Sequence, residues 1–314
     1  MTESRKGNRF AIQTFSLSRK FGDLIAVNSI DLSIKEGELF SLLGPNGAGK
    51  TTAIKMLCCL LRPSRGTAII MGHDINEDSL AVKRIIDVSP QETAIAEHLN
   101  AWENLSLIGG IRGLVKEEVK KRSEELLEMV GLTKRAKEQV RKFSGGMKRR
   151  LSIAMALVSD PEVLFLDEPT LGLDPQSRRG IWEHIAELKG KKTILHTTHY
   201  LEEADALADR IAIIDEGKIA ALGTPQELKD SISDMQVMVV RAKNLTPDVI
   251  EGLKEIYPEV KATEDGIEIK AKELSFYEIV DYLRPRGVAI QSTSLKQPTL
   301  DDVFLHLTGK ELRE

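Results

Sequence analysis

A glycine-rich segment after an apolar run is the feature that most limits how this chain can fold. The run covers 39–43, and "GPNGAGKT" (44–51) follows it directly. The segment satisfies the pattern G-x-x-x-x-G-K-[ST] between a predicted buried strand and a helix that begins near Lys50. Glycines at this density cost backbone entropy, so they indicate close approach of the backbone to another group. The alternative is a glycine-rich turn with an incidental lysine.

This pattern predicts a nucleoside triphosphate as the bound group. Backbone N–H groups between Gly44 and Gly49 can cradle phosphate oxygens, and the positive end of the following helix adds to the attraction. Lys50 is placed to reach the β and γ phosphates, and Thr51 to put its hydroxyl on Mg²⁺. The first prediction is therefore a phosphate site at the start of a helix.

A second motif, "VLFLDEPT" (163–170), carries two acidic residues at the end of an apolar run. The carboxyl ends of strands are where α/β sheets bind ligands. Asp167 can hold the magnesium shell, and Glu168 can accept a hydrogen bond from an attacking water. Two adjacent acids after a strand are also common as a solvated strand end, so this motif gains its meaning from the phosphate loop upstream.

Composition places the chain among ordinary globular proteins and excludes some partners. Apolar residues make up 41% and charged residues 29% of 314 residues. The net charge of −4 gives no electrostatic footprint for nucleic acid. The short basic clusters, Lys148 to Arg150 and Lys191 with Lys192, are interpreted as solvated faces.

The sequence also predicts a reduced, cytoplasmic setting. The two cysteines, Cys58 and Cys59, are neighbours in a helical pattern, where disulfide geometry is hard to satisfy. Met1 to Arg9 is polar and lacks the apolar stretch of a secretory signal. No apolar run approaches the ~20 residues that span a bilayer. If the protein works at a membrane, another chain must supply the crossing.

Short apolar runs alternate with helical patterns and predict a mostly parallel α/β sheet covered on both faces. Strand-like runs at 10–34 precede the phosphate loop, and others follow at 163–166, 193–195 and 211–214. From about 92 to 159, charged stretches and helical spacing predict an inserted helical subdomain, in which Gly131 ends a helix.

The pattern changes again past Leu228, which predicts two domains, 1–230 and 231–314. Strand candidates at 236–240, 260–263, 267–270 and 288–292 alternate with helical patterns at 249–256 and 276–283. This order, βαββαβ, suits a small ferredoxin-like α+β domain. A final helix near 302–307 would turn Val303, Phe304 and Leu307 inward.

The chain resembles the ATP-binding subunit of an ABC transporter over about residues 10 to 230. The resemblance rests on five motifs in this order: "GPNGAGKT" (44–51), "FSGGMKRR" (143–150), "VLFLDEPT" (163–170), "LGLD" (171–174) and "TTHYLEEAD" (197–205). It implies a P-loop NTPase core of the RecA-like kind with an antiparallel β subdomain and a helical subdomain. It also implies ATP and Mg²⁺ as cofactors.

The resemblance implies three groups of site residues. The expected catalytic residues are Glu168, His199 (the switch histidine) and Gln91 (the Q-loop glutamine). The expected magnesium-shell residues are Thr51, Gln91 and Asp167. The expected nucleotide-binding residues are Phe21, Gly44, Pro45, Asn46, Gly47, Ala48, Gly49, Lys50, Thr51, Thr52, Ser144, Gly145, Gly146 and Asp174.

Some positions depart from the family pattern. Phe21 stands where the family more often stacks a tyrosine on adenine, so the ring face remains and the hydroxyl is lost; its alternative role is a core aromatic at a strand end. Phe143 and Met147 replace the outer residues of L-S-G-G-Q but leave the Ser-Gly-Gly centre intact. His196 has no match and is interpreted as a strand residue with a structural partner.

The resemblance also implies partners and a location. The chain holds one phosphate loop and one Ser-Gly-Gly motif, so a homodimer that sandwiches ATP is the simplest complete unit. A separate transmembrane permease would place the chain peripherally on the cytoplasmic face of the membrane. The tail, "PTLDDVFLHLTGKELRE", resembles that of daunorubicin-type, or multidrug-resistance, export ATPases. The alternatives are a soluble ABC ATPase in repair or translation and a regulatory ATP-binding module without turnover.

Overall fold

A computed structural model describes residues 9–232, 236–257, 259–296 and 298–310, so the N-terminal prediction for Met1 to Arg9 lies almost wholly outside the described residues. The described chain forms two compact units. The first comprises the described residues of Met1–Pro225 and Leu307–Glu314, and the second is Gln226–His306.

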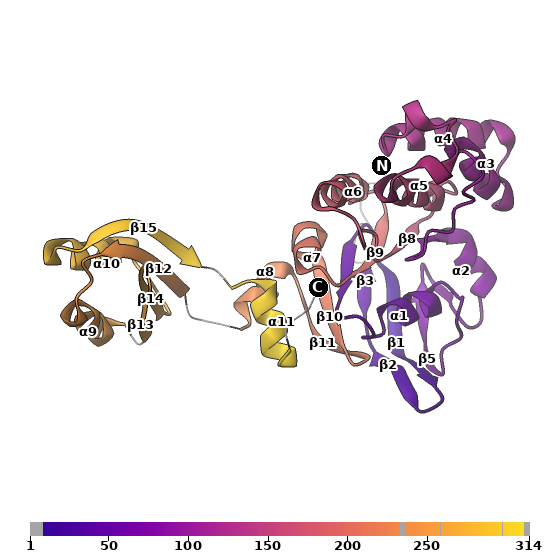
Figure 1. Cartoon of the computed structure of the whole chain (residues 1–314). Coiled ribbons are helices and arrows are strands. Elements are labelled where there is room, and N and C mark those ends of the chain that lie inside the picture. Colours follow the sequence, from indigo (N-terminus) through magenta and orange to yellow (C-terminus); the bar gives the residue numbers. More distant parts are fainter. Residues whose placement is uncertain (1–8, 233–235, 258, 297, 311–314) are drawn as a thin grey trace, which may run out of the picture. The chain divides into compact units, whose positions relative to one another are not determined.

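A six-stranded sheet forms the centre of the first unit (Figure 1). Its strands run in the order β11-β10-β4-β9-β8-β7, and only β11 is antiparallel to its neighbour. Strands β4, β8 and β9 are buried along their whole length, because helices α1, α5 and α7 pack against them from outside the sheet. The bounds are β4 Leu39–Leu43, β7 Ile86–Ser89, β8 Val163–Asp167, β9 Thr193–Thr198, β10 Arg210–Asp215, β11 Lys218–Gly223, α1 Lys50–Leu57, α5 Gly145–Leu157, α6 Pro175–Leu188 and α7 Leu201–Leu207.

An antiparallel sheet completes the core of this unit. Strand β1 pairs with β2, β3 and β5, and β5 pairs with β6. Its buried residues share one apolar core with α1 and the central sheet, including Ile12, Ile34, Met56 and Phe165. The bounds are β1 Phe10–Phe21, β2 Leu24–Ile30, β3 Ser33–Lys35, β5 Arg65–Ile70, β6 His73–Asp74 and the short helix α2 Ser79–Ile85. The sequence reading did not identify β5, β6, β7 or β11.

The predicted helical insertion is present between β7 and β8. Helices α3 (Ala101–Ile111), α4 (Lys116–Met129) and α5 pack on one another, with 3₁₀ turns η1 Thr133–Arg135 and η2 Val140–Lys142 between them (Figure 1). A capping box between Asn100 and Glu103 starts α3. Gly131 follows the end of α4 with φ of 65°, which agrees with its predicted role as a helix stop.

The second unit contains the predicted element order βαββαβ. Its sheet runs β13-β14-β12-β15 and is antiparallel throughout, and α9 and α10 share its apolar core, which includes Val240, Leu253, Ile269 and Ile279. The bounds are α8 Pro225–Asp230, β12 Gln236–Lys243, α9 Pro247–Ile256, β13 Glu259–Thr263, β14 Gly266–Ala271, α10 Phe276–Leu283, η3 Arg284–Arg286, β15 Ala289–Lys296 and α11 Leu300–Thr308.

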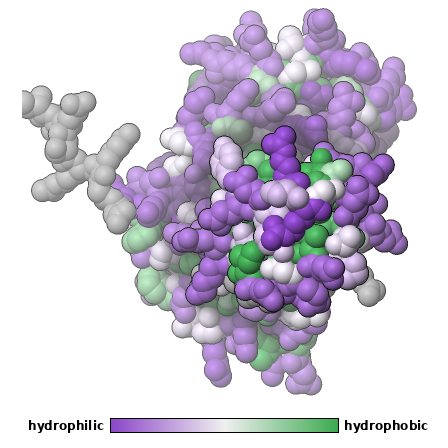
Figure 2. Space-filling view, turned by 90° about the vertical axis from the view of Figure 1, so that its left-hand side faces the viewer, coloured by the Kyte–Doolittle hydropathy of each residue, from purple (hydrophilic) through white to green (hydrophobic). Residues whose placement is uncertain are grey.

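Two predictions for the C-terminal segment are wrong: the end of its last strand and the burial of Leu307. Strand β15 extends to Lys296, four residues beyond its predicted end, because it pairs with β12 along almost its full length. In α11, Val303 and Phe304 are buried as predicted, whereas Leu307 is 38% exposed. In the view of Figure 2, hydrophilic residues surround scattered hydrophobic patches; the large exposed apolar residues of this unit are Ile256, Phe276, Tyr277, Leu295 and Leu305.

Two further properties bear on the setting of the protein. Cys58 is buried, Cys59 is half-buried, and both are free thiols. Within the described residues, no helix combines the length and the apolar character that crossing a bilayer requires.

The core predicts a strong difference between two phenylalanines. Phe165 in β8 is fully buried, whereas Phe15 in β1 is 49% exposed. Phe165→Ala should lower the free energy of unfolding by about 3–5 kcal/mol, because it leaves a cavity in the shared core. The matched change Phe15→Ala should cost about 1 kcal/mol or less. Urea denaturation measures both, and equal losses would contradict the assigned core.

Candidate nucleotide site

The phosphate loop joins β4 to α1, and its shape depends on glycine. Gly47 and Gly49 have positive φ values of 84° and 105°. A Cβ on Gly49 would lie 2.3 Å from the carbonyl oxygen of Ala26, and one on Gly44 would lie 2.1 Å from that of Ile214. No side chain caps the N-terminus of α1, and no acidic residue lies in its first turn. The loop therefore presents backbone N–H groups to an anion at the positive end of α1.

Lys50 is the first residue of α1 and is buried within the loop. Its Nζ donates to the carbonyl oxygens of Gly44 at 2.7 Å and Pro45 at 3.1 Å. It also forms an ion pair with Oε1 of Glu168 at 2.9 Å. The lysine charge therefore faces the loop and the end of β8 at the same time.

Glu168 lies between two partners from different segments. Its Oε2 is 2.7 Å from Nδ1 of His199, which follows β9, while its other oxygen contacts Lys50. Burial alone would raise the pKa of the Glu168 carboxyl, but the hydrogen bond from His199 and the charge of Lys50 outweigh it, and the pKa is lowered. The carboxylate is therefore ionised at neutral pH and able to accept a hydrogen bond.

The backbone of Glu168 is in a sparsely populated conformation. Its φ of 50° costs a non-glycine residue about 1–3 kcal/mol. The N–H of Glu168 donates to Thr197, both to Oγ1 at 2.9 Å and to the Thr197 carbonyl oxygen at 3.2 Å. The carbonyl oxygen of Glu168 accepts from Nη2 of Arg149. Neighbouring groups thus hold the strained residue on both sides.

Oxygen ligands suited to a divalent cation lie beside this carboxylate. Oδ1 of Asp167 accepts from the hydroxyl of Thr51 at 3.1 Å and from that of Thr197 at 2.7 Å. Mg²⁺ in nucleotide sites is held by one or two carboxylates together with the substrate phosphates. The Thr51 hydroxyl and the Asp167 carboxylate fit that requirement. Gln91 lies two residues after β7 with an exposed side chain.

Other predicted residues lie apart from this cluster. Ser144 is the N-cap of α5 and accepts from the N–H of Met147 at 3.3 Å. Asp174 caps α6 by accepting from the N–H of Ser177 at 2.9 Å. Phe21 is 43% exposed, and the guanidinium of Arg19 lies 4.5 Å from its ring centroid. Among the described residues, no hydrogen bond or ion pair joins these three to Lys50, Asp167 or Glu168.

His196 has the structural partner that the sequence reading predicts. It is fully buried in β9, and Oγ of Ser41 in β4 lies 3.1–3.2 Å from its ring nitrogens. Burial lowers the pKa of His196 to about 4, so the ring is neutral.

The interpretation of Lys148 to Arg150 as a solvated face is wrong. Arg149 is only 5% exposed, and its guanidinium contacts the end of β8 and the segment after β7. Arg150 is half-buried and donates to the carbonyl of Val130 at 2.8 Å. A run of charged residues does not reveal which side chain points inward. Here Arg149 is buried because it lies on the buried face of helix α5.

Sequence reasoning also missed Glu203 in α7. Its Oε2 accepts from the hydroxyls of Thr170 at 2.9 Å and Thr198 at 2.6 Å, which links the segment after β8 to the end of β9. Burial is the largest cause that raises the pKa of Glu203, and the nearby Glu168 also raises it; the hydrogen bonds from the two threonines lower it, and the resulting pKa is about 7. A carboxyl in the local sequence "YLEEAD" gives no sign of complete burial.

Comparisons with known proteins show which families the chain resembles. A family model described as "ABC transporter" matches residues 27–171, and one described as "ATP-binding protein DrrA1-3-like, C-terminal domain" matches 223–308. The chain is 39% identical to the daunorubicin resistance ATP-binding protein DrrA3 of Streptomyces coeruleorubidus, over 96% of this chain and 97% of the relative. It is 37% identical to the linearmycin resistance ATP-binding protein LnrL of Bacillus subtilis strain 168, over 96% and 100%.

A solved structure is similar to part of this chain. It is a dimeric ATP-binding cassette in a post-hydrolysis state with ADP and Pi bound. The match has a TM-score of 0.61 and 28% sequence identity, and it covers 68% of this chain and 98% of that one.

The raised pKa of Glu203 predicts a pH-dependent stability. The unfolded chain titrates near the ordinary value of 4.5, so between about 4.5 and 7 the folded chain binds more protons. Stability due to this group therefore falls as pH rises through that window. Glu203→Gln removes this titration. The free energy of unfolding of the variant minus that of wild type should therefore be larger at pH 8 than at pH 5, by on the order of 1–3 kcal/mol.

Urea denaturation at the two pH values measures this effect. Glu202→Gln, an exposed neighbour on the same helix, is the matched control. A difference between Glu203→Gln and wild type that does not change with pH would show that Glu203 does not titrate in this window.

Proposed function

The chain belongs to the family of ABC transporter ATP-binding subunits, and we propose that the cluster of Lys50, Glu168 and His199 is its hydrolytic centre. One observation carries the proposal: the Glu168 carboxylate lies 2.9 Å from the phosphate-loop lysine and 2.7 Å from the histidine. The function is ATP binding and hydrolysis that power export through a separate transmembrane permease. The match to a drug-resistance ATP-binding protein over 96% of the chain, together with the ABC transporter family model, favours this function over a soluble repair or translation ATPase.

The loop and Lys50 are proposed to bind the triphosphate. Lys50 now satisfies its charge with Glu168 and two loop carbonyls. Phosphate oxygens would take over these contacts, with backbone N–H groups of the loop and of the first turn of α1 completing the cradle. Phe21, exposed at the end of β1, is proposed to stack on the adenine ring.

Magnesium is proposed to bind at the Thr51 hydroxyl and the Asp167 carboxylate, and the Gln91 amide is proposed to join its shell. When bound, Mg²⁺ neutralises charge on the phosphate oxygens. Asp167 is well suited because the hydroxyl of Thr197 fixes its Oδ1 at 2.7 Å.

Glu168 is proposed to orient the attacking water and accept its proton, and His199 to hold the γ-phosphate end of the site. Transfer of a phosphoryl group depends mainly on positioning and charge stabilisation. Three hydrogen-bonded neighbours already fix Glu168 at its backbone and side chain: Thr197, Arg149 and His199. The base therefore needs little rearrangement when substrate binds.

Two copies of the chain are proposed to complete each site. Ser144 and Gly145 are exposed at the start of α5, without a hydrogen bond to the Lys50 cluster within the described residues. Ser144, Gly145 and Gly146 of one copy would cover the triphosphate bound by the other, and Asp174 lies at the start of the neighbouring helix α6. The family forms such dimers, and an isologous pair gives two identical sites.

We propose residues 1–230 as the ATP-binding domain and 231–314 as an accessory domain. The protein would lie on the cytoplasmic face of the membrane, held there by its permease. This location follows from the family and from the need to bind ATP, and the accessory domain has no assigned ligand.

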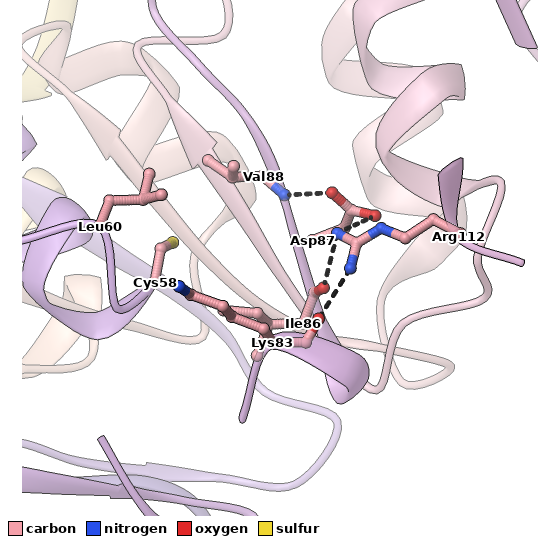
Figure 3. Close-up of a pocket in the computed structure, with 7 residues that line it drawn as sticks. All are labelled: Cys58, Leu60, Lys83, Ile86, Asp87, Val88 and Arg112. Carbon is pink, nitrogen blue, oxygen red and sulfur yellow. Dashed lines mark hydrogen bonds and ion pairs between the residues drawn. The ribbon is translucent and has the colours of Figure 1, made fainter. Parts of the chain in front are cut away.

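A pocket of about 180 Å³ is proposed as the permease contact (Figure 3). In Figure 3 the Arg112 guanidinium faces the Asp87 carboxylate, 2.7 Å away, while Leu60, Cys58 and the Lys83 side chain lie on the other side. The lining residues are Cys58, Leu60, Lys83, Ile86, Asp87, Val88 and Arg112. Leu60 is 65% exposed, and β7 leads from this pocket to Gln91. A partner seated here would therefore lie next to the segment that enters the nucleotide site.

The assigned base predicts the outcome of a conservative change. Glu168→Gln should bind ATP and dimerise but hydrolyse ATP at least ~100-fold more slowly, as expected for loss of a catalytic base. Phosphate release under saturating ATP measures the rate. The matched control is Glu162→Gln, which changes an exposed carboxyl just before β8.

Lys50→Ala is the contrasting variant and should lose nucleotide binding itself. Hydrolysis at the wild-type rate by Glu168→Gln would rule out the assigned role. Absence of hydrolysis by the wild-type chain, alone and with its membrane partner, would instead rule out the proposed centre as a whole.

The pocket predicts which surface change breaks the complex. Leu60→Glu should reduce co-purification of a multi-span protein from native membranes by about tenfold, because it replaces an exposed apolar side chain of the pocket lining with a charged one. Leu222→Glu changes a 41% exposed leucine in β11, at the opposite edge of the sheet from β7, and should retain the partner. Equal recovery with both variants would exclude this pocket as the contact.

A further inference from the structure

Arg149 binds five backbone carbonyl oxygens that belong to two segments of the nucleotide site. Its Nε donates to Pro169 at 2.7 Å, and Nη1 donates to Pro90 at 2.6 Å and Gln91 at 3.2 Å. Its Nη2 donates to Asp167 at 2.7 Å and to Glu168. An arginine side chain has five N–H donors, so its donors and these acceptors are equal in number.

We infer that Arg149 is a positioning residue for ATP hydrolysis, which holds the Gln91 segment and the Asp167–Pro169 segment in one fixed arrangement. The inference rests on the proposed hydrolytic centre, because it assigns Arg149 an effect through Glu168 and Gln91. The guanidinium touches neither loop 44–51 nor the reacting groups in any recorded contact.

The burial of this charge calls for an explanation beyond packing. Arg149 is 5% exposed, and no carboxylate forms an ion pair with it among the described residues. Buried charges are costly unless their hydrogen bonds are complete, and a well-packed apolar residue is often as stable. Here the charge is compensated by carbonyl dipoles and by the fields of Asp167, Glu168 and Glu203. The desolvation cost of the Arg149 guanidinium is explained if the activity depends on the positions of those carbonyl groups.

Two features make the positions matter for the reaction. Glu168 has φ of 50°, a conformation that persists only when its surroundings hold it, and Arg149 fixes its carbonyl and those on both sides. The same guanidinium fixes the carbonyl of Gln91, the residue proposed to reach the magnesium shell. Arg149 thereby sets the distance between the base and the metal-side amide through the backbone.

The location of Arg149 in α5 adds a connection to the dimer interface. Ser144 caps the start of this helix, and Arg149 lies on the same helix five residues later. A rigid helix therefore joins the segment proposed to meet the second copy to both segments that Arg149 binds. Lysine in this position would keep the charge but offer three donors from a single nitrogen, which cannot span carbonyls from two segments in the same way.

Arg149→Lys tests the inference against a matched neighbour. Arg150→Lys makes the same chemical change on the same helix, where the arginine has one recorded hydrogen bond, to the carbonyl of Val130. Steady-state hydrolysis gives kcat and KM for each variant, calorimetry gives the Kd of a non-hydrolysable ATP analogue, and thermal unfolding checks the fold. Arg149→Lys should lose about 10²-fold in kcat with a Kd within about threefold of wild type. Arg150→Lys should keep both.

A second variant separates positioning from general stability. Arg149→Ala should recover part of its lost kcat when guanidinium ion is added at concentrations below those that unfold the chain. Arg150→Ala should show no gain under the same conditions. If Arg149 only stabilised the fold, a variant that is already folded would gain no kcat from added guanidinium ion. Rescue of kcat therefore distinguishes positioning from a structural role.

The possible outcomes test the role of Arg149 separately from the proposed hydrolytic centre. A kcat of Arg149→Lys equal to that of Arg150→Lys, or a loss confined to the Kd, overturns the inference while the hydrolytic centre stands. Failure of both Arg149 variants to fold, with folded Arg150 variants, also overturns it, because the residue then serves the fold alone. Loss of hydrolysis in Glu168→Gln alongside either result leaves the proposed centre in place.

Discussion

The ion pair between Lys50 and Glu168, completed by His199, is the interaction on which the rest of the site depends. It joins three segments: the phosphate loop after β4, the end of β8 and the residue after β9. These strands are neighbours in the order β4-β9-β8, and Leu43 pairs with Thr198 while Asp167 pairs with Thr197. The parallel sheet therefore brings the carboxyl ends of the three strands to one edge, where their charged side chains meet.

Within this cluster the charges of Lys50 and Glu168 satisfy each other. Lys50 is 5% exposed and Glu168 3%, so each would be costly to bury alone. Triphosphate binding at the proposed site would exchange one anion for another at Lys50, and this would release Glu168 for its proposed role as base while His199 still holds it. On this proposal, nucleotide binding and hydrolysis are linked because both use the same ion pair. The strained φ of Glu168 and its partners Thr197 and Arg149 keep the carboxylate in reach during the exchange.

The sequence allows some of this to be predicted and hides the rest for physical reasons. The phosphate loop and "VLFLDEPT" are local patterns, so strand, loop and helix could be read from adjacent residues, and α10 begins and ends where predicted. Strands β5, β7 and β11 are short or partly exposed and lack a long alternation, and pairing partners far along the chain decide them. Arg149 and Glu203 resemble surface charges in sequence, and only the packing of α5 and α7 shows that both are buried. The assigned roles of the site residues remain predictions.

The most direct test of this account is the affinity of the chain for a non-hydrolysable ATP analogue with Mg²⁺, measured by calorimetry for wild type and Glu168→Ala. Removal of Glu168 leaves Lys50 without its internal anion, so the phosphate no longer competes with a carboxylate for the same charge. The account predicts that Glu168→Ala binds the analogue about tenfold more tightly than wild type. Equal or weaker binding by the variant would contradict the claim that the Lys50–Glu168 ion pair gives way to the triphosphate.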